Sequence, residues 1–229
     1  MARRGPHLQQ RVPVSLLTLS FDNGPDPRVT PRVLDVLASH AITAQFFVLG
    51  KNLVTEEGRR LVSRARDEGH LVGNHSYTHA IPLGEDVRPD AVEAEIAATD
   101  ALLAPLVPGP KWFRPFGGGG KLGPHLLSPP AVEHLLRHQY SCVLWNSVPG
   151  DWLDPKGWPE KALADCASRA HTLMVLHDIP DACLEGLDGF LHEAKARGMR
   201  FTTACPPDCV PIVDGRIVSD LSGLVAARG

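Results

Sequence analysis

The chain has 229 residues, of which 43% are hydrophobic and 21% charged, a composition typical of one globular domain. Its net charge of −3 provides no basic face, which argues against nucleic acid or an anionic membrane surface as a partner. No stretch approaches the roughly 20 apolar residues of a membrane span. The five cysteines match no common metal-site spacing and are expected to be free thiols; a disulfide or soft-metal pair at Cys205 and Cys209 is the alternative.

Strand-like and helix-like segments alternate along the chain. The first strand, 14–19, is followed by a helix that Thr30 caps, with Pro31 at the first helical position. Thr55 is expected to cap the next helix and Gly69 to end it. The other strands are expected at 44–48, 70–73, 111–114, 140–145, 172–176 and 199–203, and the helices at 30–40, 55–68, 90–103, 131–138, 159–170 and 184–196.

This alternation indicates parallel βαβ units. Seven strands favour a distorted (β/α)7 barrel, similar to a TIM barrel, over a doubly wound sheet, and no Gly-x-Gly-x-x-Gly follows the first strand. We expect an N-terminal extension at 1–13, the barrel domain at 14–205, and a C-terminal extension at 206–229 packed on the barrel. Asp214-Gly215 predicts a small hairpin or an edge extension within that last segment.

Polar clusters follow the predicted strands at their carboxyl ends, where barrel active sites are built. They are Asp22, the pair His75 and His79, Arg114, Asp151, and His177. If 75–79 forms a helical turn, both imidazoles face one ion, and imidazole suits zinc, cobalt or nickel. The alternative is a histidine that hydrogen-bonds near a strand end and a second that is solvated.

Five segments together resemble the polysaccharide deacetylase family, the NodB homology domain of carbohydrate esterase family 4. They are Ser20-Phe21-Asp22-Asn23-Gly24-Pro25, His75-Ser76-Tyr77-Thr78-His79, Arg114-Pro115-Phe116-Gly117, Asp151-Trp152 and Leu176-His177-Asp178. The resemblance implies a hydrolase that removes acetyl groups from an N- or O-acetylated glycan or oligosaccharide. It also implies a divalent metal as cofactor, with zinc expected and cobalt or nickel as alternatives. It leaves the particular glycan and the oligomeric state open.

The resemblance also implies a role for each matching residue. Asp22 corresponds to the general base, held ionised by Arg114, and His177 to the general acid, oriented by Asp151. The metal ligands correspond to Asn23, His75 and His79. The implied substrate-binding residues are Phe116, whose backbone N–H would stabilise an oxyanion, and Trp152 and Leu176, which would surround the acetyl methyl group.

Asn23 stands where the family usually has aspartate. An amide oxygen is a neutral and weaker ligand than a carboxylate, so we expect weaker metal binding and a more Lewis-acidic ion. Deamidation at Asn23-Gly24 is a further hypothesis, because it would restore aspartate at this position.

Two other functions stay open at this point. A catalytically silent carbohydrate-binding relative is favoured by Asn23, and a metal-independent amide hydrolase acting on a small molecule would suit a chain without a signal peptide. As written, the sequence predicts a cytoplasmic location; an extracellular one would follow if the N-terminus were truncated.

Overall fold

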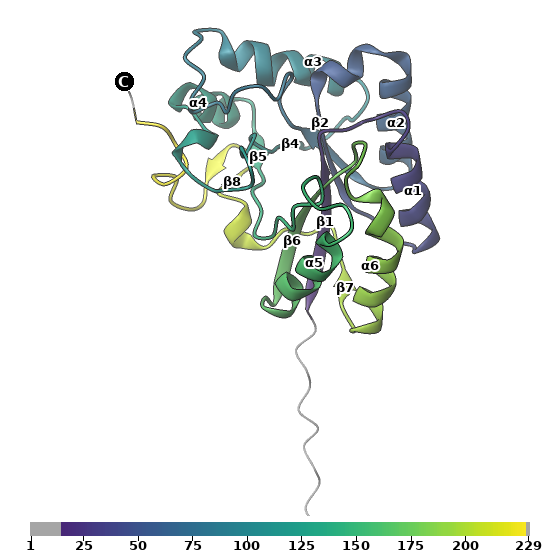
Figure 1. Ribbon diagram of the computed structural model, residues 1–229. Coiled ribbons are helices and arrows are strands. Elements are labelled where there is room, and N and C mark those ends of the chain that lie inside the picture. The colour runs from purple at the N-terminus through teal and green to yellow at the C-terminus, as the bar shows by residue number, and fades with distance from the viewer. Residues whose placement is uncertain (1–14, 228–229) are drawn as a thin grey trace, which may run out of the picture.

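The computed structural model describes residues 15–227, so the predicted extension at 1–13 lies outside the described residues. Within this range one curled sheet forms the centre of the molecule and helices surround it (Figure 1). The strand order is β6-β1-β2-β3-β4-β5-β8-β9, and the short β7 pairs with the first half of β1. The predicted (β/α)-barrel-like fold is confirmed.

The parallel strands are β1 (Leu16–Asp22), β2 (Gln45–Val48), β3 (Leu71–Asn74), β4 (Lys111–Phe113), β5 (Tyr140–Cys142), β6 (His171–His177) and β7 (Arg200–Phe201). Two antiparallel strands, β8 (Ile212–Val213) and β9 (Arg216–Ile217), extend the edge at β5. The α-helices are α1 (Thr30–Ser39), α2 (Glu56–Asp67), α3 (Ala98–Leu103), α4 (Pro129–Arg137), α5 (Trp158–Ala167) and α6 (Leu184–Ala196). Short helical turns occupy η1 (Gly50–Val54), η2 (Glu93–Ala97), η3 (Pro124–Leu126) and η4 (Pro207–Cys209).

Strand β1 presents an apolar face to the helices and a polar face to the inside of the barrel. Because side chains alternate along a strand, Leu17, Leu19 and Phe21 share one face and join the core cluster that includes residues of α1 and α6. Ser20 and Asp22 share the other face. The β1–β6 register pairs Asp22 with His177, so the carboxyl ends of these two neighbouring strands meet at one point.

Several predicted elements differ in detail from the structure. Strand β5 ends at Cys142 instead of residue 145, and the helix expected over 90–103 contains the π-helical turn η2, a feature frequent at functional sites. Thr30 does not cap α1: its hydroxyl donates to Asp178 Oδ2 and accepts from the backbone N–H of Asp26. Thr55 does cap α2, by accepting from the Gly58 N–H at 3.0 Å.

The C-terminal segment contacts the sheet edge. The expected hairpin is present, with Asp214 and Gly215 at positive φ in its turn, and the Gly215 N–H donates to the carbonyl of Tyr140 at 2.9 Å. All five cysteines are free, as predicted. Among the described residues, no helix combines the length and apolar character needed to cross a membrane.

Candidate active site

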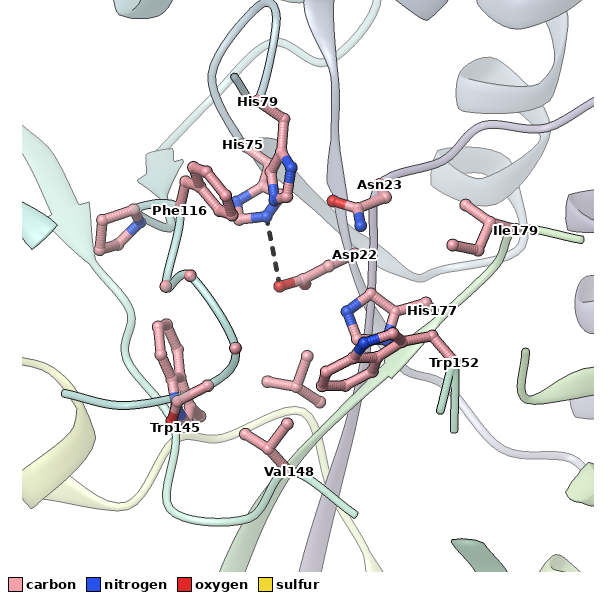
Figure 2. A pocket seen from close by; sticks show the side chains of 16 residues that line it. Asp22, Asn23, His75, His79, Phe116, Trp145, Val148, Trp152, His177 and Ile179 are labelled. Carbon is pink, nitrogen blue, oxygen red and sulfur yellow. Dashed lines mark hydrogen bonds and ion pairs between the residues drawn. The ribbon is translucent and has the colours of Figure 1, made fainter. Parts of the chain in front are cut away.

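A cavity of about 250 Å³ opens at the carboxyl ends of the parallel strands. Figure 2 shows side chains from distant parts of the chain converging on it. The predicted residues that line it are Asp22, Asn23, His75, His79, Phe116, Trp152 and His177. Arg114 and Asp151 lie behind them, both fully buried, and act on the cavity through Asp22 and His177.

Asp22 is paired with a buried arginine. The Arg114 guanidinium donates from Nη1 to Asp22 Oδ1 at 2.8 Å and to Ser20 Oγ at 2.6 Å, and its central carbon lies 4.0 Å from the centre of the Phe47 ring. Burial acts to raise the pKa of Asp22, but the charge of Arg114, followed by those of the nearby histidines, holds the pKa below its ordinary value. Asp22 is therefore an ionised carboxylate at neutral pH, and its Oδ2 does not bond to the arginine.

His75 presents one defined ring nitrogen to the cavity. Its Nδ1 lies 2.8 Å from the carbonyl oxygen of Arg114, and because a carbonyl can only accept, Nδ1 carries the proton. The unprotonated Nε2 lies 3.5 Å from Asp22 Oδ2. A histidine whose second nitrogen donates to a carbonyl is the usual arrangement of a metal ligand.

His79 joins His75 without the helical turn that the spacing predicted. Residues 75–79 form an irregular loop in which Ser76 and His79 adopt positive φ, at 69° and 56°, and the two ring centres lie 4.9 Å apart. Left-handed backbone at non-glycine residues is typical of functional sites. Burial and the neighbouring His75 lower the pKa of His79 to about 3, and burial also lowers the pKa of His75. Both imidazoles are therefore neutral and able to coordinate a cation at neutral pH.

Glu95, a buried residue of η2 that the sequence reasoning missed, anchors this loop. Its Oε2 accepts from the backbone N–H groups of Tyr77 and Thr78, and its Oε1 accepts from the Thr78 hydroxyl at 2.6 Å. Arg88 donates to the same carboxylate at 3.2 Å. The π-helical turn thus places an acid under the loop that carries both histidines.

The Asn23 side chain completes a set of neutral donors. Its amide oxygen is buried and has no hydrogen-bond partner among the described residues, and in Figure 2 it faces the imidazoles of His75 and His79. A buried unpartnered oxygen costs free energy unless something binds it. Two neutral imidazoles and one free amide oxygen suit a divalent metal of the zinc type, so the residues present fit such an ion.

His177 and Asp151 form the second hydrogen-bonded pair of the site. Asp151 accepts from His177 Nδ1 through Oδ1 and from the His177 backbone N–H through Oδ2, both at 2.8 Å. Burial acts to lower the pKa of His177, but the hydrogen bond and charge of Asp151 outweigh it and raise the pKa above 6.5. The proton on Nδ1 is fixed, which leaves Nε2 for chemistry.

Aromatic and aliphatic side chains form the walls of the cavity. The Phe116 ring contacts His79 in a tilted arrangement with ring centres 3.7 Å apart, and the Trp152 ring meets His177 edge-on with centres 4.7 Å apart. Trp145, which the sequence reasoning did not select, donates from its indole to the carbonyl of Gly120 at 2.8 Å. The glycine-rich loop expected to form one wall lies at the cavity; a Cβ at Gly117 would come within 2.5 Å of the Trp145 ring, so this close approach needs glycine.

Leu176 was predicted to contact the acetyl group, and this prediction is wrong. Alternation along β6 directs Val175 and His177 into the cavity and Leu176 into the apolar core on the other side. Val175 is the residue that sequence alternation, counted back from His177, would have identified.

The site combines an ionised carboxylate, a histidine with a raised pKa, and neutral donors suited to a metal, all at one mouth of a barrel-like α/β fold. Such an arrangement is suited to a hydrolase that activates water.

Comparison with known proteins identifies the family. The model of the polysaccharide deacetylase family matches residues 9–122. The peptidoglycan-N-acetylglucosamine deacetylase of Bacillus cereus is 31% identical over 195 residues, covering 82% of this chain and 66% of that protein. The chitooligosaccharide deacetylase of Rhizobium leguminosarum bv. phaseoli is 32% identical over 181 residues, covering 75% and 72%. The chain belongs to the polysaccharide deacetylase family, as its motifs predicted.

Solved structures agree with this assignment. The Bc1960 peptidoglycan N-acetylglucosamine deacetylase superposes with a TM-score of 0.71 at 27% identity, over 88% of this chain and 90% of that one. A family 4 acetyl xylan esterase from Clostridium thermocellum, bound to a cobalt ion, gives a TM-score of 0.66 at 30% identity, over 82% and 87%. Carbohydrate esterase family 4 enzymes use a divalent metal, and the cobalt complex is one instance.

Proposed function

We propose that this protein hydrolyses the acetyl group of N-acetylglucosamine units in a glycan, with Asp22 as base and His177 as acid. One observation carries the proposal: two hydrogen-bonded pairs, Asp22–Arg114 and His177–Asp151, face the same cavity beside two neutral histidines. A site that had lost its chemistry would have no need to keep a buried carboxylate and a histidine facing one cavity, each held by its own buried partner.

The residues divide the proton transfers between them. Asp22 Oδ2 accepts a proton from the attacking water, while Oδ1 stays bonded to Arg114, which keeps the carboxylate aimed. His177 donates from Nε2 to the leaving amine, since Asp151 occupies its Nδ1. The backbone N–H of Phe116 is the proposed donor to the developing oxyanion.

A divalent metal held by Asn23, His75 and His79 would supply a Lewis acid beside these groups and make water a stronger acid. Zinc is the proposed ion, with cobalt or nickel as substitutes, because imidazole and amide ligands suit all three. The neutral amide of Asn23 brings no negative charge to the ligand set, so we expect weaker affinity than aspartate would give.

The proposed substrate class is an N-acetylated glycan, peptidoglycan or a chitooligosaccharide. It is supported by the activities in the names of two relatives that are 31% and 32% identical to this chain. The small cavity with apolar walls at Phe116, Trp145, Val148 and Trp152 suits an acetyl methyl group and a sugar face.

The test is acetate release from N-acetylated chitooligosaccharides, peptidoglycan fragments and acetylated xylan by zinc-loaded protein. We expect release from the N-acetylated substrates, and a loss of at least 100-fold in Asp22→Asn. Asp67→Asn, which removes an exposed carboxylate on α2, is the matched control and should keep full activity. Release from xylan alone would contradict the N-acetyl assignment, and no release from any substrate would contradict the enzymatic function.

The neutral ligand Asn23 favours one alternative, a silent carbohydrate-binding relative. That alternative predicts glycan binding without acetate release by the native chain, and release only after Asn23→Asp. The same acetate assay therefore separates the two functions.

A further inference from the structure

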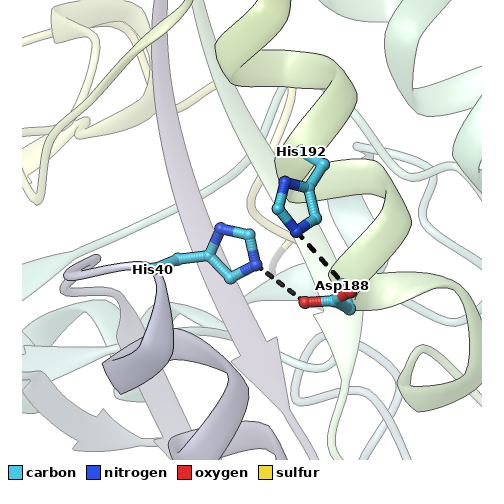
Figure 3. A group of neighbouring side chains, drawn as sticks. All are labelled: His40, Asp188 and His192. Atoms are coloured by element: carbon cyan, nitrogen blue, oxygen red, sulfur yellow. Dashed lines mark hydrogen bonds and ion pairs between the residues drawn. The ribbon is translucent and has the colours of Figure 1, made fainter.

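A second group of metal-ligating side chains lies away from the cavity, between α1 and α6. It consists of His40 at the C-terminal end of α1, and Asp188 and His192 one turn apart on α6 (Figure 3). Helix α1 begins near the active site, where Thr30 bonds to Asp178, and runs back along the barrel to His40. The group therefore lies toward the opposite end of the strands from Asp22.

The three side chains converge on one point. His40 Nε2 lies 2.8 Å from Asp188 Oδ1 and His192 Nε2 lies 3.8 Å from Asp188 Oδ2, and the two ring centres are 4.6 Å apart. One ligand atom from each residue can be chosen so that all lie within 4.8 Å of one another. Tetrahedral zinc with bonds of about 2.0 Å to nitrogen separates its ligands by roughly 3.3 Å, so modest rotamer changes close the set.

The side chains of this group would be better satisfied by a bound cation than by their contacts with one another. One carboxylate faces two imidazoles, and the hydrogen bond from His40, together with the nearby rings, lowers the pKa of Asp188. His40 Nε2 lies within hydrogen-bond distance of Asp188, whereas His192 Nε2, at 3.8 Å, makes only a long contact with the same carboxylate. A divalent ion would instead use the lone pairs of both neutral imidazoles and the carboxylate charge together.

His40 is held in place for this role. Its ring is 5% exposed, and its backbone carbonyl accepts from Lys195 Nζ at 2.7 Å, which fixes the end of α1 to α6. Asp188 and His192 are exposed, at 63% and 73%, so the open side of the group is accessible to solvent and to an entering ion. The group therefore has one buried ligand at the end of α1 and two solvent-accessible ligands on one face of α6.

We propose that His40, Asp188 and His192 form a second divalent-metal site, of zinc type, that links the end of α1 to α6. Three protein ligands leave a coordination position for water. The proposed role of the site is structural, because a bound ion would stabilise the contact between the two helices. This role can be measured through metal content and melting temperature, independently of acetate release.

The test is calorimetric titration of chelated protein with Zn²⁺ alone. The double variant His75→Ala/His79→Ala removes the ligands of the cavity, and we expect it to bind one equivalent of zinc. Adding Asp188→Ala, which removes the third ligand, should weaken that binding at least tenfold and abolish the zinc-dependent rise in melting temperature. Adding Glu193→Gln, which removes a neighbouring exposed carboxylate paired with Arg197, should change neither.

A double variant that binds no zinc would overturn the proposal, as would unchanged binding after Asp188→Ala. If the double variant does not fold, the native chain decides: it should bind two equivalents of zinc and its Asp188→Ala variant one. Equal stoichiometry in those two proteins would overturn the proposal as well.

Discussion

Replacing Asn23 by aspartate tests the proposed metal ligands of the cavity by exchanging one side-chain amide for a carboxylate. The substitution conserves shape, and the backbone of residue 23 is left-handed at φ 76°, a conformation that asparagine and aspartate both tolerate. The change therefore adds a negative charge beside His75 and His79 with little strain. Its consequences should have opposite signs without and with metal.

Without metal, the new carboxylate lines the same cavity as Asp22, which is 4% exposed, and Arg114 Nη1 already donates to Asp22 and Ser20. Two like charges at an effective dielectric constant of 20 repel by about 4 kcal/mol at a separation of 4 Å and by less at longer separations. Proton uptake by one carboxylate relieves part of this repulsion, so we expect the free energy of unfolding to fall by about 1–3 kcal/mol. Each kcal/mol lost should lower the melting temperature by roughly 2–4 °C.

With zinc, the same charge attracts the cation, and affinity should rise at least tenfold, about 1.4 kcal/mol. Thermal melts in chelator and in zinc, with a zinc titration, measure both effects. Gln139→Glu, which adds the same charge on an exposed loop, is the control and should change neither quantity. Equal zinc affinity in Asn23→Asp and the native chain would refute the role of residue 23 as a ligand.

Three further substitutions probe the supporting residues. Asp151→Asn should lower the pKa of His177, so the alkaline limb of the pH–kcat profile moves to lower pH; an unmoved limb contradicts the pairing. Glu95→Ala should weaken zinc binding by roughly 10–100-fold in titrations, and Glu95→Gln should have an intermediate effect. Unchanged zinc affinity in Glu95→Ala would show that loop 75–79 keeps its conformation without Glu95. Burial raises the pKa of Asp178 from 3.8 to about 7, so its stabilising contribution is complete below pH 4 and is lost as pH rises through about 7. Urea unfolding in chelator should show a fall of about 2–3 kcal/mol from pH 5 to 7 that Asp178→Asn flattens; parallel curves would contradict this.

The sequence alone was sufficient to predict the barrel-like fold and most of the residues around the cavity. Apolar segments followed by polar residues mark the carboxyl ends of parallel strands, and those ends must lie together once the strands pair. The register that pairs Asp22 with His177 is a direct consequence, since both residues end their strands.

Other features depend on packing that local pattern does not encode. The convergence of His75 and His79 arises from left-handed backbone in an irregular loop, held by Glu95 from a helix that follows in sequence. The hydroxyl of Thr30 has a stronger partner in Asp178, far along the chain, than the cap that its position suggested. Leu176 was assigned to the wrong side of β6 because motif matching ignored alternation.

The most direct test of the central claim is acetate release from an N-acetylated chitooligosaccharide by chelated native protein, before and after zinc is added. We expect negligible release without metal and a rate that rises on zinc addition and saturates, with no such rise in His75→Ala/His79→Ala. Release that is undiminished by chelation, or that the double variant retains, would contradict a metal-assisted site built on Asn23, His75 and His79.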